Sequence, residues 1–131
     1  MNGSERLRAE FSQPEIADGW EILAEGDGNG CYGYGSRDLL MYLRGPDGLI
    51  YCQEASCCSC NGIEGAFDPV ETNIQTIRRD LASYEGKPVL ENGVWRTLGY
   101  GIDTEKARVA REALEKLRSA DSSSEPQGEI D

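Results

Sequence analysis

The chain has 131 residues and a formal net charge of −11, from 13 basic and 24 acidic side chains, and it contains no histidine. This length suits one domain with a modest hydrophobic core, and a negative field disfavours direct binding to nucleic acid or acidic membranes. Without histidine, Ser–His and Cys–His nucleophile pairs and imidazole proton shuttles are excluded, which favours a binding protein over an enzyme.

The composition divides the chain into three parts. Residues 1–17 are expected to form a polar N-terminal lead-in, residues 18–120 a single domain, and residues 121–131 a disordered acidic tail, because that last stretch has nothing to bury. The first residues lack an apolar signal-like run, and no apolar stretch approaches the ~20 residues that cross a bilayer. We therefore expect a cytoplasmic protein.

The first half of the domain is rich in strand signals. Residues 20–25 alternate in polarity, which predicts a strand. Residues 38–44 and 49–54 flank Gly-Pro-Asp-Gly at 45–48, a sequence typical of a β-hairpin turn. The small, polar and cysteine-rich residues 55–68 are predicted to form a loop.

The second half alternates helix and hairpin. Residues from Glu71 to Gly86 have apolar side chains at helical spacing, with Thr72 as the expected N-cap. Asn92-Gly93 predicts a second hairpin, and Asp103 should cap a second amphipathic helix that ends near Ala120. The predicted fold is α+β, a small antiparallel sheet of hairpins with two amphipathic helices packed on one face.

The acidic residues are concentrated in one region. Residues 18–70 carry 9 acidic but only 2 basic side chains, so this region should attract a basic protein partner. Two tyrosines in the run Cys-Tyr-Gly-Tyr-Gly at 31–35 add aromatic contact area, although they would equally suit a short strand. The candidate partner-binding residues are Glu21, Glu25, Asp27, Tyr32, Tyr34, Asp38, Asp47, Glu54, Glu64 and Asp68.

Five cysteines suggest an alternative. Cys57 and Cys60 form a C-x-x-C pair, and Cys31 and Cys52 each lie near the end of a predicted strand, so these four thiols could supply a tetrahedral zinc site. A second C-x-x-C is missing, and the same thiols could instead pack as small hydrophobic groups. A third alternative is a small enzyme that relies on carboxylates or a thiol.

The stretch Tyr51-Cys52-Gln53-Glu54-Ala55-Ser56-Cys57-Cys58-Ser59-Cys60, followed by a Thr-led helix, resembles small uncharacterised proteins of actinobacterial phages over residues 38–85. That resemblance implies an origin but no activity or functional residue. Small acidic phage proteins are often inhibitors or modulators of host machinery, including counter-defence proteins. The leading hypothesis is therefore a non-enzymatic acidic protein that binds a basic surface of a host protein, with no cofactor, and the zinc module is the alternative.

Overall fold

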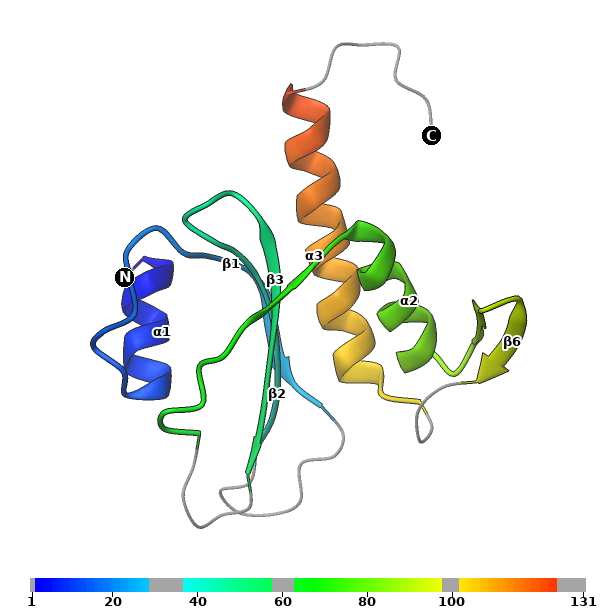
Figure 1. Ribbon diagram of the computed structural model, residues 1–131, viewed down its shortest axis with the longest axis horizontal. Coiled ribbons are helices and arrows are strands. Elements are labelled where there is room, and N and C mark those ends of the chain that lie inside the picture. The colour runs from blue at the N-terminus through cyan, green and yellow to red at the C-terminus, as the bar shows by residue number, and fades with distance from the viewer. Residues whose placement is uncertain (1, 29–36, 58–62, 98–101, 125–131) are drawn as a thin grey trace.

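A computed structural model describes residues 2–28, 37–57, 63–97 and 102–124. The chain forms a four-stranded antiparallel sheet in the order β1-β2-β3-β4, a separate two-stranded sheet of β5 and β6, and three helices (Figure 1). The elements are α1 (Gly3–Phe11), β1 (Glu21–Asp27), β2 (Arg37–Arg44), β3 (Ile50–Cys57), β4 (Val70–Thr72), α2 (Ile74–Tyr84), β5 (Pro88–Glu91), β6 (Val94–Thr97) and α3 (Thr104–Ser124). The predicted α+β class is confirmed.

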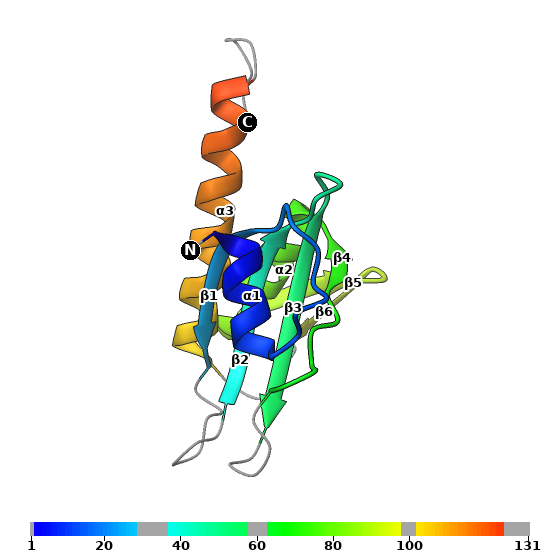
Figure 2. The same ribbon diagram turned by 90° about the vertical axis from the view of Figure 1, so that its left-hand side faces the viewer.

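The four-stranded sheet is covered on both faces (Figures 1 and 2). Strand β2 is the centre, because its apolar run is buried on both sides: Leu40 and Tyr42 face α2 and α3, and Leu39, Met41 and Leu43 face α1. A strand buried on both faces reads as a continuous apolar run rather than an alternation. Two hydrophobic cores therefore lie back to back across one sheet.

Helix α1 was not expected in the polar lead-in. Asn2 and Glu5 form a capping box, with the Glu5 amide donating to Asn2 Oδ1 over 2.9 Å. Leu7 and Phe11, one turn apart, are fully buried against the sheet. Two apolar side chains are enough to dock a nine-residue helix, although they scarcely change the polar composition of the segment.

Several other boundaries differ from the sequence-based expectation. Strand β1 contains a register shift between Ile22 and Ala24, so Leu23 and Ala24 are both buried and the simple alternation is broken. Residues 70–72 pair with β3 as β4, so Asn73 rather than Thr72 caps α2. Helix α3 runs to Ser124, four residues beyond the expected domain end.

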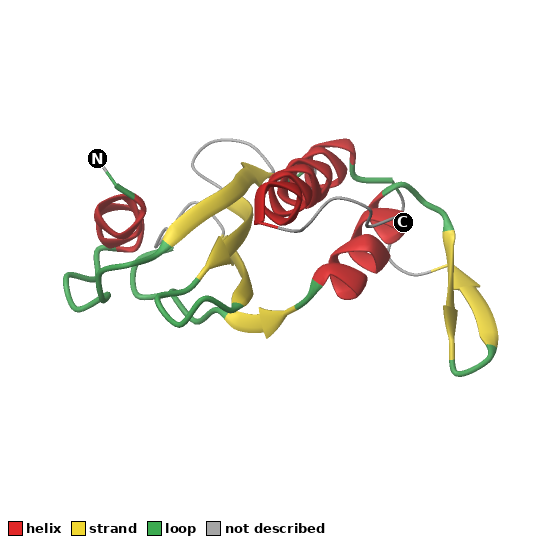
Figure 3. Cartoon of the chain, turned by 90° about the horizontal axis from the view of Figure 1, so that it is seen from above, coloured by secondary structure: helices red, strands yellow, loops and turns green. Residues whose placement is uncertain are grey.

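The two predicted hairpins are present. In the first, Gly48 has a φ of 85° and closes the turn between β2 and β3. In the second, Asn92 and Gly93 both have positive φ, as a two-residue hairpin connection requires. This second hairpin does not join the large sheet but extends outward beyond α2 (Figure 3).

Candidate functional site

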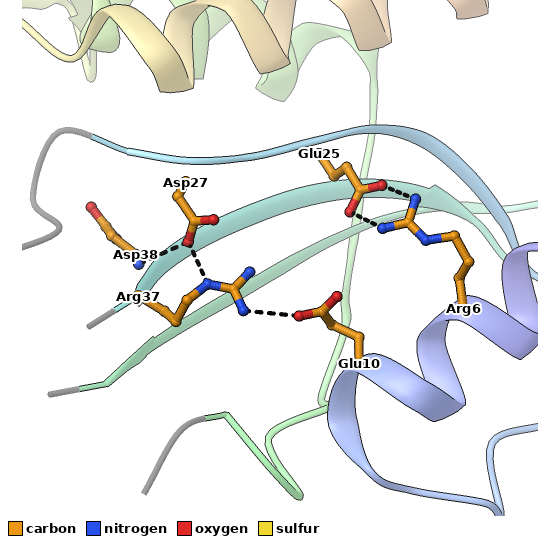
Figure 4. A network of polar contacts seen from close by, with 6 residues as sticks. All are labelled: Arg6, Glu10, Glu25, Asp27, Arg37 and Asp38. Carbon is orange, nitrogen blue, oxygen red and sulfur yellow. Dashed lines mark hydrogen bonds and ion pairs between the residues drawn. The ribbon is translucent and has the colours of Figure 1, made fainter. Parts of the chain in front are cut away.

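Most of the predicted partner-binding acids near β1 form ion pairs with arginine side chains of the same chain (Figure 4). Arg6 of α1 forms a two-pronged ion pair with Glu25, one arm measuring 2.8 Å. Arg37 places Nε 2.9 Å from Asp27 and Nη1 2.9 Å from Glu10, and these two hydrogen bonds raise the pKa of the guanidinium, the one to Asp27 more strongly. This network ties α1 to the sheet.

Two further acids from the predicted set are also paired. Asp38 lies 3.0 Å from Lys106 Nζ of α3, and Glu21 lies 3.4 Å from Arg44 on the neighbouring strand. Together with Glu25 and Asp27, they have internal cationic partners, so their charge is largely neutralised where they sit. A count of acidic residues along the chain overstates the charge available to a partner.

Four more residues of the predicted set are not part of these ion pairs. Asp47 belongs to the β2–β3 turn, where its carboxylate accepts hydrogen bonds from Tyr51 Oη at 2.7 Å and the Leu49 amide at 3.0 Å. These bonds lower its pKa, the tyrosine bond most. Glu64 is exposed on a loop. Tyr32 and Tyr34 lie outside the described residues.

The last two predicted acids, Glu54 and Asp68, line a cavity of about 370 Å³ between β3, β4 and α2. The other lining residues are Cys52, Val70, Glu71, Thr72, Thr76, Asp80 and Tyr84. Alternation along β3 and the four-residue spacing of Thr76, Asp80 and Tyr84 on α2 explain why these side chains share one side of their elements. The cavity is thus built from residues that are distant in sequence.

A buried glutamine positions the loop that carries Asp68. Gln53, 1% exposed, donates from Nε2 to the backbone oxygens of Glu54 and Ala66 at 2.8 and 3.0 Å, and its Oε1 accepts from the Asp68 amide at 2.7 Å. All of the hydrogen-bonding groups of this amide are used except one acceptor lone pair. The loop is therefore fastened to β3 at the rim of the cavity.

Four carboxylates surround the cavity, those of Glu54, Asp68, Glu71 and Asp80. None of them forms an ion pair with a cationic side chain in the described part of the chain. Asp80 accepts a hydrogen bond from Tyr42 Oη at 2.8 Å. Burial raises the pKa of Asp80, and the nearby charge of Glu54 raises it further, while the Tyr42 hydrogen bond and the charge of Arg79 partly oppose this rise.

The remaining polar groups of the cavity are neutral. Burial, reinforced by Glu54, raises the pKa of the Cys52 thiol to about 12, and burial also raises the pKa of the Tyr84 phenol. Thr72 Oγ1 is buried and has no hydrogen-bond partner in the described structure. The cavity therefore offers several acceptors and an unsatisfied hydroxyl, which suits a cation with several N–H donors.

The zinc alternative is not tested, because two of its four cysteines lie outside the described residues. Cys31 and Cys60 lie outside the described residues, and Cys57 ends β3. Cys52 is a free, half-buried thiol that packs against the core formed with α2 and α3. Within the described residues, no group of three or more potential ligands is placed to hold a metal ion. The four-cysteine site stays a prediction.

Sequence reasoning identified Glu54 and Asp68 but not Glu71 and Asp80. Both missed residues fell in a segment expected to be one amphipathic helix, whereas its first residues form β4, which places Glu71 at the cavity rim. The spacing of Thr76, Asp80 and Tyr84 was the available signal, because it marks a polar stripe beside the apolar one.

No family model, curated protein or solved structure matches this chain. The resemblance to phage proteins accordingly stays a prediction. Among the described residues, no helix is both long enough and apolar enough to cross a membrane.

Proposed function

We propose that this protein is a non-enzymatic interaction protein that binds a basic surface of a protein partner, with the acidic cavity receiving a cationic side chain. The observation that carries the proposal is the set of four carboxylates without a cationic partner among the described residues. Elsewhere on the sheet, comparable acids are matched by arginine or lysine. Uncompensated charges that converge on a concavity favour a cation from outside.

Arginine is the side chain that fits this chemistry best. A guanidinium presents five N–H donors in a planar fork and binds carboxylates in a two-pronged manner, and it is more weakly hydrated than an ammonium group. Glu54 and Glu71 are exposed at the rim, while Asp80 and Thr72 Oγ1 lie deeper. The stem of the arginine would pass between the rim acids, and its head would reach the inner acceptors.

The binding role is supported over catalysis by the state of the cavity groups. The Cys52 thiol, with a pKa of about 12, stays protonated at neutral pH and is therefore a poor nucleophile. The phage resemblance suggests that the partner is a host protein and that binding inhibits or modulates it. Basic grooves of nucleic-acid-binding proteins are the obvious class, because carboxylates can stand in for phosphates.

The cavity can be tested with a fluorescently labelled oligo-arginine peptide as the probe, followed by fluorescence anisotropy. We expect binding that weakens as salt rises, since exposed charges are screened. The double variant Glu54→Gln/Glu71→Gln should weaken binding by about tenfold, or about 1.4 kcal/mol. The matched control is Glu64→Gln/Glu115→Gln, which removes the same charge from exposed positions away from the cavity.

Equal losses in the two double variants would show that net charge alone attracts the peptide, and the cavity would then have no special role. Unchanged binding at high salt would contradict the acidic-surface proposal as a whole. The partner itself is sought by a tagged pull-down from an actinobacterial lysate, washed across a salt series and read by mass spectrometry. The cavity variant and its control, used as bait in parallel, identify the proteins whose capture depends on Glu54 and Glu71.

A further inference from the structure

The β5–β6 hairpin has an inner side that is tied to α2. Val89 is buried, and Glu91 forms ion pairs with Arg79 of α2 and with Arg96 across the hairpin. The hairpin lies beyond α2, on the side away from the four-stranded sheet (Figures 1 and 3). It is therefore a fixed projection of the domain.

The opposite side of the hairpin is apolar and exposed. Leu90 and Trp95 are direct cross-strand partners on this side and are 56% and 67% exposed. Val94, next to the turn, is 57% exposed, but it pairs with Glu91 and so lies on the other side of the hairpin. Ile102 is also exposed, and its side chain lies against Gly86 at the base of the hairpin. Four of the six exposed large hydrophobic residues of the described chain thus belong to the hairpin or to its base. Tryptophan is the residue most enriched among interface hot spots.

The hairpin also has an open hydrogen-bonding edge. Among the described strands, β6 pairs with β5 alone, so its outer edge faces no strand. A two-stranded hairpin by itself is only marginally stable in water, and an apolar edge strand readily pairs or packs with another chain. Burial of the Leu90–Trp95 face would stabilise the hairpin.

The charge distribution indicates which partner can cover this face. Residues 74–97 carry 4 basic and 3 acidic side chains, whereas the rest of the chain carries 9 and 21. Lys87 and Arg111 both pair with Glu85, and Arg79 and Arg96 both pair with Glu91, so most charges around the hairpin are satisfied within the chain. A strongly charged partner would therefore gain few new ion pairs here. A second copy of this chain, which the net negative charge repels at its other surfaces, meets the least repulsion at this one.

We propose that the Leu90–Trp95 face of the β5–β6 hairpin is a self-association surface that binds the same face of a second copy of this chain. A two-fold axis brings identical patches together, so each Trp95 packs against the apolar residues of the other hairpin. The interface is apolar at its centre, as homodimer interfaces are, and the charges that border it are already paired within the chain. Because the patch is small, the dimer should be weak and concentration-dependent.

The test is sedimentation velocity of the full chain over a concentration series, at low and at high salt. The wild-type protein should shift from monomer to dimer as its concentration rises. Added salt should strengthen the dimer, because it screens the repulsion between two chains of charge −11. Trp95→Ser should remain monomeric at every concentration. The matched control is Val70→Ser, since Val70 on β4 is 66% exposed and lies outside the hairpin.

A monomer at all concentrations and both salt conditions would overturn this proposal, and so would a dimer that Trp95→Ser leaves intact. Circular dichroism checks that both variants keep the wild-type fold. This inference is independent of the cavity, because binding of oligo-arginine weakens with salt whereas the hairpin dimer strengthens. The same two experiments on Trp95→Ser and on Glu54→Gln/Glu71→Gln therefore separate failure of one proposal from failure of the other.

Discussion

The acidic residues on the α1 face of the four-stranded sheet and those around the cavity have opposite roles. On the α1 face, Glu25, Asp27 and Glu10 are each matched by an arginine, and the resulting pairs hold a short helix against the sheet. On the other face, beside α2, the carboxylates of the cavity have no cationic partner within the described residues. Charge that is paired contributes to folding, and charge that is left unpaired costs stability but is available for binding.

The largest effect expected on the α1 face comes from Phe11. Its side chain is fully buried and contacts Phe67, with ring centroids 5.4 Å apart. Phe11→Ala should lower the free energy of unfolding by about 3–5 kcal/mol, because it leaves a cavity between α1 and the sheet. Chemical denaturation followed by circular dichroism measures the loss. A loss below about 1 kcal/mol would show that α1 is not a structural part of the domain.

A smaller effect is expected from the ion pairs on the same face. Arg37→Gln leaves Asp27 and Glu10 without their cation and should lower the free energy of unfolding by about 0.5–1 kcal/mol. The effect is modest because the three side chains are 26–37% exposed. Arg78→Gln is the control, since Arg78 is exposed on α2 and has no ion-pair partner among the described residues. Equal effects in the two variants would mean that the network adds nothing beyond net charge. Raising the salt concentration should shrink the difference between them.

Local signals in the sequence located most elements correctly. Gly48 and the Asn92-Gly93 pair marked turns because positive φ is cheap only for glycine and, to a lesser degree, asparagine. Asp103 was expected to cap the last helix, and its Oδ1 does accept from the Lys106 amide at 3.1 Å. These features depend on neighbours within a few residues, which is why they can be predicted from the sequence alone.

Only half of the candidate site could be predicted from the sequence, because its assembly depends on contacts between distant residues. Whether an acid is paired depends on contacts such as Arg6 with Glu25 and Asp38 with Lys106. These contacts join residues that are at least 19 positions apart in the sequence. The cavity likewise arises because β4 pairs with β3 and places Glu71 and Asp80 near Glu54. The sequence supports an acidic binding region, but only the contacts between distant elements separate acids paired within the fold from acids available for binding.

The smallest expected effect is that of Asp80→Asn on the free energy of unfolding. Its sign should be opposite to that of Arg37→Gln on the α1 face, because it should stabilise the protein. Burial raises the pKa of Asp80 above the ordinary value of 3.8, so its ionised form is less favourable in the folded protein than in the unfolded chain. The stability associated with this group is fully present below the unfolded pKa and is lost as pH rises through the folded pKa. The asparagine in Asp80→Asn cannot ionise, and its side-chain oxygen still accepts the hydrogen bond from Tyr42.

Asp80→Asn should therefore gain stability relative to the wild type as pH rises, with the gain levelling off above the folded pKa of Asp80. Denaturant unfolding of both proteins from about pH 4 to about pH 8 measures the difference. Glu54→Gln removes the charge that pushes the pKa of Asp80 up, so in that background the same gain should level off at a lower pH and be smaller. A wild type that is more stable than Asp80→Asn at neutral pH would show that the hydrogen bond from Tyr42 outweighs burial. Asp80 would then stabilise the fold as Asp27 does, and only the acids at the cavity rim would differ from the paired acids of the α1 face.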